Sequence, residues 1–328
     1  MAIPELERLA AGDKPFFLFI RHMDPHSPYL APAPFKDMFF QGDAFDPEDK
    51  RMQKVYDFKP FGDYIGSWVP KGCTNPDYVI AQYDSAVAYM DNCIQQVLEK
   101  LYALNLEEDT IVVFVSDHGE TLYDHDCYFD HHGMYEPTLV VPFIVVWKNH
   151  LPSCVRIKDY MQLKDVTPTL LDIMGIDTGL PFEGRSMMPL VYGRSLMTLV
   201  RGEHREAEPE FYITECTWMR KHGWRTPEWK LIVSKEPDFH FKPMVELYNL
   251  VKDPEENHNV ADENPEIVEA LKKRMDAWIE KRVKETGRPN PIDVNFLKDG
   301  KPFASSQEAY EGKYIGGIAD AVKLQKKD

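Results

Sequence analysis

Three almost continuous apolar runs constrain the fold of this chain more than any other feature of its sequence. They are 15–20 (PFFLFI), 110–115 (TIVVFV) and 140–147 (VVPFIVVW). Runs without polar alternation predict strands that are covered on both faces, as in the parallel sheets of α/β proteins. In the third run Pro142 is expected to mark the beginning of the strand, because proline cannot donate to a sheet ladder.

A long amphipathic helix is predicted between the first two runs. Asn75 is a favourable N-cap and Pro76 a favourable first helical residue. The apolar residues that follow recur at helical spacing, and they are Tyr83, Val87, Met90, Ile94, Val97 and Leu101. Strand, helix and strand in this order imply a right-handed parallel crossover. We therefore expect an α/β fold, with a mostly parallel sheet flanked by helices, and a short helix at 165–174 that ends at Gly175.

The pattern changes after residue 200. Short runs at 211–214, 229–233 and 245–250 are separated by turn residues, which predicts a smaller antiparallel sheet with one face covered. The cover is expected to be a helix that begins at Asn264-Pro265 and ends before Gly287. Its inward residues are expected to be Ile267, Leu271, Met275 and Trp278. A basic cluster between two of the runs is expected on a solvated hairpin, and it consists of Arg220, Lys221, His222 and Arg225.

Charge and composition exclude several classes of function. With 38 Lys and Arg against 54 Asp and Glu, the formal net charge is −16, which disfavours nucleic acids and anionic membranes as partners. No stretch approaches the ~20 consecutive apolar residues of a membrane span, and residues 1–15 lack the profile of a secretory signal. The five cysteines form no CxxC pair, which excludes a disulfide framework and a four-cysteine zinc site. The compartment is left open.

Acidic and imidazole side chains follow two of the apolar runs. The second run ends in DHGE at 117–120, and the first is followed by DPH at 24–26. Because ligands of α/β sheets bind beyond the carboxyl ends of the strands, we expect these two segments to converge on one site. Gly119 permits the turn that would let both Asp117 and His118 face one metal ion. A solvated polar loop with hydrogen-bonded histidines is the alternative.

In their order and spacing, several segments resemble the sulfatases of the alkaline-phosphatase superfamily, and the resemblance covers nearly the whole chain. The segments are PFFLFIRHMDPHSPY, YDSAVAYMDNCIQQVLEKL, TIVVFVSDHGE, FDHHGMYEPTLVVPFIV, DVTPTLLDIMGI, EGRSMMPLV and ELYNLVKDPEENHNVADENPEIVEAL. The resemblance implies a sulfuric ester hydrolase with an incomplete alkaline-phosphatase-like fold. It would comprise a partial catalytic α/β domain at 1–200, an α+β subdomain at 201–287 and an irregular tail at 288–328.

The resemblance also implies roles for particular residues. Asp117 and His118 match the second half of the family's metal site. Ca²⁺ is the expected ion, with Mn²⁺ or Zn²⁺ as alternatives because one ligand is an imidazole. His26 matches the histidine that faces the sulfate and the nucleophile. Many members have a lysine shortly before the residues that match Tyr135-Glu136, where this chain has His131 and His132. One of these two is expected to supply the positive charge, and the spacing leaves open which.

Two parts of the family pattern are not found in this chain. One is the pair of acidic residues that completes the metal site, and the other is the Cys- or Ser-x-Pro/Ala-x-Arg motif that is matured to formylglycine. Cys73, for example, is followed by TNPD. We therefore expect the chain to correspond to the C-terminal part of a sulfatase. It should be inactive by itself, because the nucleophile and half of the metal site are absent.

Two other functions stay open at this stage. A phosphoester or phosphonate hydrolase of the same superfamily would use the same metal half-site, although the ELYNLVKDPEEN segment favours a sulfatase. A fragment or pseudoenzyme that binds an anion or a partner chain without catalysis is the second alternative. The expected partner of an enzyme is a sulfated small molecule or glycan. The sequence leaves the oligomeric state and localisation open, although family members are often exported.

Overall fold

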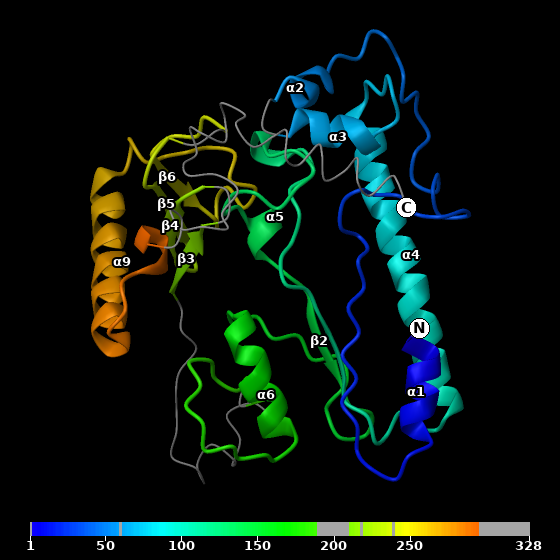
Figure 1. Ribbon diagram of the computed structural model, residues 1–328. Helices are drawn as coiled ribbons and strands as arrows, with labels where there is room; N and C mark the ends of the chain where they lie inside the picture. Colours follow the sequence, from blue (N-terminus) through cyan, green and yellow to red (C-terminus); the bar gives the residue numbers. More distant parts are fainter. Residues whose placement is uncertain (1, 59–60, 189–209, 217–218, 238–239, 295–328) are drawn as a thin grey trace.

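The computed structural model describes residues 2–58, 61–188, 210–216, 219–237 and 240–294. The long helix α4 (Pro76–Ala103) forms one side of the molecule, and a four-stranded sheet covered by α9 (Pro265–Thr286) forms the other (Figure 1). The other α-helices of the described residues are α1 (Ala2–Ala10), α2 (Gln53–Tyr56), α3 (Gly62–Trp68), α5 (Glu136–Leu139), α6 (Val166–Ile173) and α10 (Pro291–Val294). None of the helices in these ranges is long and apolar enough to cross a membrane.

Helix α4 begins as its sequence predicts. The Asn75 side chain caps it by accepting a hydrogen bond from the backbone N–H of Asp77 at 2.9 Å, and Pro76 is the first helical residue. Near its C-terminal end, Lys100 forms an ion pair of 2.8 Å with Glu7 of α1, which lies alongside (Figure 1). The first turns of α4 pack with α2, α3 and the segment around Tyr29 into one apolar core.

The predicted parallel sheet is not confirmed. Strand β1 (Val112–Val115) pairs with β2 (Phe143–Val146) in antiparallel register, and Val112 lies opposite Val146. Strand β2 begins directly after Pro142, as predicted. No other strand joins this pair within the described residues. A continuous apolar run predicts burial on both faces, but it does not distinguish a parallel from an antiparallel neighbour.

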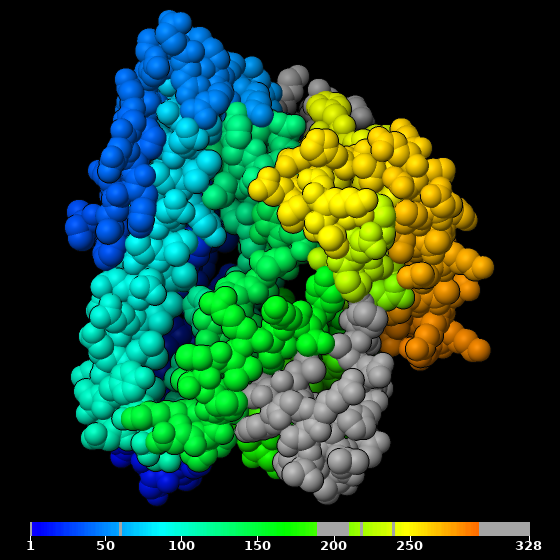
Figure 2. Space-filling model, turned by 180° about the vertical axis from the view of Figure 1, so that it is seen from behind, coloured from blue at the N-terminus to red at the C-terminus, as the bar shows by residue number. Residues whose placement is uncertain are grey.

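The prediction of a strand at 15–20 is wrong for this structure. The segment runs beside the two-stranded sheet (Figure 1) without forming a ladder, and Phe17 and Phe19 are 84% and 75% exposed. A strand needs a hydrogen-bonded neighbour, and the described residues provide none for this segment. Side chains of β2 such as Ile144 are also exposed, and the space-filling view shows hollows between α4 and the part of the chain that contains β2 and α6 (Figure 2).

The C-terminal sheet agrees with its prediction in type and adds one strand. Its strands are β3 (Phe211–Glu215), β4 (Lys221–Arg225), β5 (Trp229–Ser234) and β6 (Val245–Asn249), in that order and antiparallel throughout. Helix α9 covers one face with Ile267, Leu271, Met275 and Trp278, and Gly287 ends it at a φ of 65°. Helix α6 likewise ends two residues before Gly175.

The basic cluster is not on a solvated hairpin, and that expectation is corrected. Lys221, His222 and Arg225 lie on β4 and are buried. The reason is that carboxylates on neighbouring elements neutralise two of them: Lys221 pairs with Glu246, and Arg225 pairs with Glu136. The proposed domain boundary at 200 lies outside the described residues. Of the predicted tail at 288–328, residues 288–294 are described, and they include helix α10, whose Ile292 is buried.

Buried charges join the C-terminal sheet to the loop between β1 and β2. Glu136, at the start of α5, forms two ion pairs through its Oε1, one with Arg225 Nε at 3.1 Å and one with Lys230 Nζ at 3.0 Å. Lys230 is fully buried on β5 and also pairs with Glu256 at 2.5 Å. The Glu256 carboxylate in turn accepts a hydrogen bond of 2.6 Å from the backbone N–H of Glu136. Burial alone would raise the pKa of Glu136, but Lys230 and Arg225 outweigh it and lower that pKa.

Lys230→Met should destabilise the chain strongly, because it removes the positive charge that neutralises the buried carboxylates of Glu136 and Glu256. Loss of one partner from a buried pair costs roughly 3–5 kcal/mol. Lys235→Met is the matched control, since Lys235 pairs with Asp293 at the surface, where an ion pair contributes at most about 1 kcal/mol. Urea unfolding of both variants checks this, and equal small losses would contradict it.

His222 should make the stability of the chain depend on pH. Its side chain is 4% exposed, and burial, assisted by Lys235, lowers its pKa from 6.5 to about 4. Between these two values the unfolded chain binds a proton that the folded chain does not, so stability falls as the pH is lowered. From pH 7 to pH 5 the loss should be on the order of 1–2 kcal/mol.

Urea unfolding of the parent chain and of His222→Asn at both pH values measures this loss as the difference between their two pH dependences, because other groups, such as Glu120 with its raised pKa, also titrate in this range. The exposed His258 provides the control variant, His258→Asn, which should keep the pH dependence of the parent chain. If His222→Asn showed the same pH dependence as the parent, the assignment of the effect to His222 would be wrong.

Candidate functional site

The residues between β1 and β2, 116–142, carry most of the candidate side chains, and we call them the site loop. The loop folds back on itself because Thr121 and Asp130 form an antiparallel bridge. The N–H of Thr121 donates to the carbonyl oxygen of Asp130 at 2.9 Å, and the N–H of Asp130 donates in return at 3.2 Å. This bridge brings His131 beside His118, although thirteen positions separate them in the sequence.

Gly119 is required by a close approach of the backbone within the site loop. Its N–H donates to the carbonyl oxygen of Thr138 at 2.8 Å. A Cβ atom at this position would lie 2.0 Å from the carbonyl oxygen of Pro137, a distance that no side chain tolerates. Glycine therefore allows the start of α5 to pack directly against the end of β1, which fixes where His118 and Glu120 point.

Three side chains of the site loop are arranged as metal ligands would be. His118, Glu120 and His131 each offer one ligand atom, and these atoms lie within 4.8 Å of one another. The rings of His118 and His131 are stacked, with centroids 4.2 Å apart and an angle of 28° between their planes. Two imidazoles and a carboxylate on one side of a loop form a donor set that suits a divalent cation.

Each of the three candidate ligands makes a further contact with a neighbouring oxygen. His118 Nδ1 lies 2.8 Å from the carbonyl oxygen of Gly119, and His131 Nδ1 lies 2.9 Å from Asp130 Oδ1. If Nδ1 carries the proton in both rings, Nε2 is left free for a metal. Glu120 Oε1 accepts a hydrogen bond of 2.9 Å from the hydroxyl of Tyr29, so its second oxygen remains available.

The pKa values at this place reflect the density of charge. Burial, together with the Asp130 carboxylate, raises the pKa of Glu120 to about 7. The hydrogen bond to Asp130 raises the pKa of His131. Burial opposes ionisation of Asp130, but the charges of His132 and His131 outweigh it and hold the pKa of Asp130 well below its usual range. Two close carboxylates, Glu120 and Asp130, create a negative potential that favours a cation here.

The segment around His26 lies next to the site loop. Its ring centroid is 6.2 Å from that of His131. The turn is held by the N–H of His26, which donates to the carbonyl oxygen of Met23 at 2.8 Å, and by a contact of 3.1 Å between the hydroxyls of Ser27 and Tyr64. The structure thus brings His26, His118 and His131 together from distant parts of the sequence. Their chemical roles remain predictions.

Two of the predicted site residues are placed differently. The Asp117 side chain is 79% exposed and accepts a hydrogen bond of 3.1 Å from the N–H of His118, outside the group of three ligands. His132 is buried against Phe61, at a centroid distance of 4.6 Å, and burial lowers its pKa. Of the two neighbouring histidines, His131 is therefore the one that lies beside His118.

Three residues of the site were missed by sequence reasoning. They are Glu120, which completes the group of ligands, Asp130, which orients His131, and Tyr29, which holds Glu120. Glu120 and Asp130 each stand one or two positions from a predicted site histidine, so their proximity was the available signal. No spacing rule relates Tyr29 to the site loop, because that contact spans ninety-one positions of the sequence.

Comparison with known proteins identifies the family of this chain. The model of the sulfatase family matches residues 2–176, and the model described as N-sulphoglucosamine sulphohydrolase, C-terminal, matches residues 124–281. Arylsulfatase K of Rattus norvegicus is 28% identical over 291 residues, which are 82% of this chain and 49% of that protein. The chain thus spans about half the length of this curated relative.

Solved structures share the fold. Phosphonate monoester hydrolase of Agrobacterium radiobacter has a TM-score of 0.62 at 20% identity, covering 84% of this chain and 59% of that one. A structure described as bound to its substrate D-glucosamine-2-N,6-O-disulfate has a TM-score of 0.56 at 18% identity, covering 81% of this chain and 61% of that one. Since the sulfatase model also covers more than half of the sequence, the chain belongs to the sulfatase family.

Proposed function

We propose that this chain provides the metal- and sulfate-facing part of a sulfuric ester hydrolase site. The observation that carries the proposal is the convergence of His26, His118, Glu120 and His131 at the end of β1. Membership of the sulfatase family supports the reaction class. The position of the site supports it separately, because α/β proteins bind ligands beyond the ends of their strands. The ester bond of a sulfated compound would be placed between His26 and the two stacked imidazoles.

The proposed metal ligands are His118, Glu120 and His131. A donor set of two imidazole nitrogens and one carboxylate oxygen favours Zn²⁺ or Mn²⁺ over the Ca²⁺ that the family resemblance implies. Asp117, exposed beside His118, is a candidate for a further oxygen ligand. When bound, such a cation would act as a Lewis acid toward an oxygen of the ester group.

His26 is the proposed proton donor for the leaving alcohol. Its Nδ1 lies 2.6 Å from the carbonyl oxygen of Ser27, and this hydrogen bond orients the ring so that Nε2 is the nitrogen left for proton transfer. His131 and His132 were the predicted sources of positive charge. Of the two, His131 is the one that lies beside His118, whereas His132 is buried and burial lowers its pKa. As a metal ligand His131 would be neutral, so the positive charge at this place would come from the cation that it helps to hold.

The proposed substrate is a sulfate ester of a sugar or of a small alcohol. The solved relative that is described with D-glucosamine-2-N,6-O-disulfate supports a sulfated sugar. Phosphonate monoester hydrolysis is the second candidate, and the TM-score of 0.62 with such an enzyme favours it at the level of the fold. The sulfohydrolase model over residues 124–281 favours the sulfate ester. Anion binding without catalysis is the remaining alternative.

Metal binding should depend on the three ligands of the site loop. Isothermal titration of the chain with ZnCl₂, MnCl₂ and CaCl₂ should show one site that prefers Zn²⁺ or Mn²⁺. His118→Ala and Glu120→Gln should each weaken it by about tenfold or more, since each removes one donor atom. His258→Ala removes an exposed histidine far along the chain and is the control. Equal affinities in all four proteins would disprove the assignment of ligands.

The chain by itself should hydrolyse 4-nitrophenyl sulfate no faster than a solution of the same metal ion. The reason is that no residue of this chain matches the formylglycine nucleophile of the family. Release of 4-nitrophenol, followed spectroscopically with and without Zn²⁺ or Mn²⁺, measures the rate. Turnover above background that His26→Ala abolishes would overturn this expectation while supporting the site. The same assay with a 4-nitrophenyl phosphonate ester distinguishes the second candidate reaction.

A further inference from the structure

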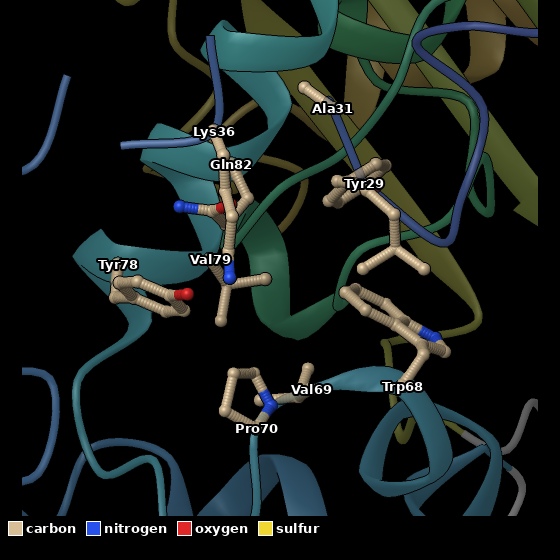
Figure 3. Close-up of a pocket in the computed structure, with 10 residues that line it drawn as sticks. Tyr29, Ala31, Lys36, Trp68, Val69, Pro70, Tyr78, Val79 and Gln82 are labelled. Carbon is tan, nitrogen blue, oxygen red and sulfur yellow. The ribbon is translucent and has the colours of Figure 1, made fainter. Parts of the chain in front are cut away.

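A cavity of about 240 Å³ is lined in part by Tyr29, whose hydroxyl donates a hydrogen bond to Glu120. It is formed where the segment 29–36 passes over the end of α3 and the first turns of α4 (Figure 3). Its lining includes Tyr29, Lys36, Trp68, Tyr78, Val79 and Gln82. A cavity of about 150 Å³ accepts one benzene ring, so this one has room for a six-membered ring with substituents.

The walls of the cavity are mainly apolar and include three aromatic side chains. Tyr29 is completely buried and packs edge-to-face on Trp68, with ring centroids 5.2 Å apart. Tyr78 and Trp68 lie on opposite sides in Figure 3, with Val69 and Pro70 between them. Rigid aromatic and aliphatic surfaces of this kind bind the apolar face of a ring with little loss of conformational entropy.

Lys36 and Gln82 bring hydrogen-bond donors to the cavity. The Lys36 side chain extends past Gln82 toward Val79 (Figure 3). Gln82 is 5% exposed, and its Nε2 has no hydrogen-bond partner among the described residues. A buried donor without a partner destabilises the protein. A ligand that places an acceptor atom beside Gln82 Nε2 would therefore remove this destabilisation on binding.

The start of helix α4 adds to this positive character. Tyr78 and Val79 stand in its first turn, where the helix dipole favours an anion. Asp77, the acidic residue of that turn, is paired with Arg51 at 3.0 Å. Burial, followed by the nearby charge of Asp37, raises the pKa of Tyr78, so its hydroxyl stays protonated and can donate.

We propose that this cavity binds one pyranose ring that carries a sulfate group, as a site separate from the ligand group of the site loop. The ring would pack between Trp68 and Tyr78. Its sulfate would accept hydrogen bonds from Lys36 and Gln82. The choice of a sulfated sugar rests on the proposed function, whereas the need for a ring with an anionic substituent comes from the cavity itself. Tyr29 forms the wall that the cavity and Glu120 share.

The test uses the whole chain, labelled with ¹⁵N at tryptophan, and glucose 6-sulfate as the probe. The indole signal that is missing from the spectrum of Trp68→Phe belongs to Trp68. Titration with glucose 6-sulfate should shift this signal and leave unchanged those of Trp224 on β4 and Trp278 on α9, which pack against each other. Glucose and sodium sulfate, titrated separately, should each shift it less, because each lacks one half of the proposed ligand.

Variants separate this proposal from a general effect of charge. Lys36→Met should weaken binding of glucose 6-sulfate by about tenfold, as expected when a charged hydrogen bond is lost. Gln82→Leu should weaken it as well. The control Lys273→Met removes an exposed lysine of α9, on the other side of the molecule (Figure 1), and should bind as the parent does.

The outcome is also separable from that of the proposed function. His118→Ala should lose metal affinity and still bind glucose 6-sulfate with the affinity of the parent chain. If the Trp68 signal does not shift, or if sodium sulfate shifts it as strongly as glucose 6-sulfate, the ring site is refuted even when the metal site is confirmed. Equal binding by Lys36→Met and Lys273→Met would also refute it.

Discussion

The placement of the candidate site depends on the buried ion pairs of Glu136. This residue follows the site histidines by a few positions, and its carboxylate is held by Arg225 and Lys230 from two strands of the C-terminal sheet. A buried charge is tolerated only when its partner is fixed, so the sheet and the site loop can fold against each other in one arrangement. The C-terminal sheet therefore holds the site loop in position through these ion pairs, although it contributes none of the candidate ligands.

The helices were predictable from the sequence because the residues that begin and end a helix act on positions only a few residues away. Asn75-Pro76, Asn264-Pro265 and Gly287 are cap residues whose effect requires a few neighbouring positions. Most of the described strands lie where the sequence predicts them, but their pairing was less predictable. Residues 110–115 and 140–147 contain β1 and β2, yet their antiparallel pairing and the absence of a ladder at 15–20 depend on residues that are distant in sequence. Strand β4 was missed because its charges are neutralised by partners that no local pattern reveals.

The candidate site shows the same division. The sequence indicated that the His26 turn would lie near the end of β1, and the rings of His26 and His131 are indeed neighbours. It did not indicate that Glu120 would join His118 and His131, or that Tyr29 would reach it. Both contacts depend on the bridge between Thr121 and Asp130, which folds the second half of the site loop back against the first half. The same fold decides whether His131 or His132 faces the site, since adjacent residues of an extended chain face opposite sides.

The uncovered side chains of Phe17, Phe19 and Ile144 affect how this chain behaves in solution. Attraction between apolar surfaces weakens on cooling, because its heat-capacity change on burial is negative. Among the residues that the structure describes, no strand pairs with the outer edges of the two-stranded sheet, and such edges are places where another chain can join. Self-association through this face would therefore grow with concentration and with mild warming, at temperatures where the interior packing is intact. Turbidity of such a solution would then report surface contacts and not denaturation.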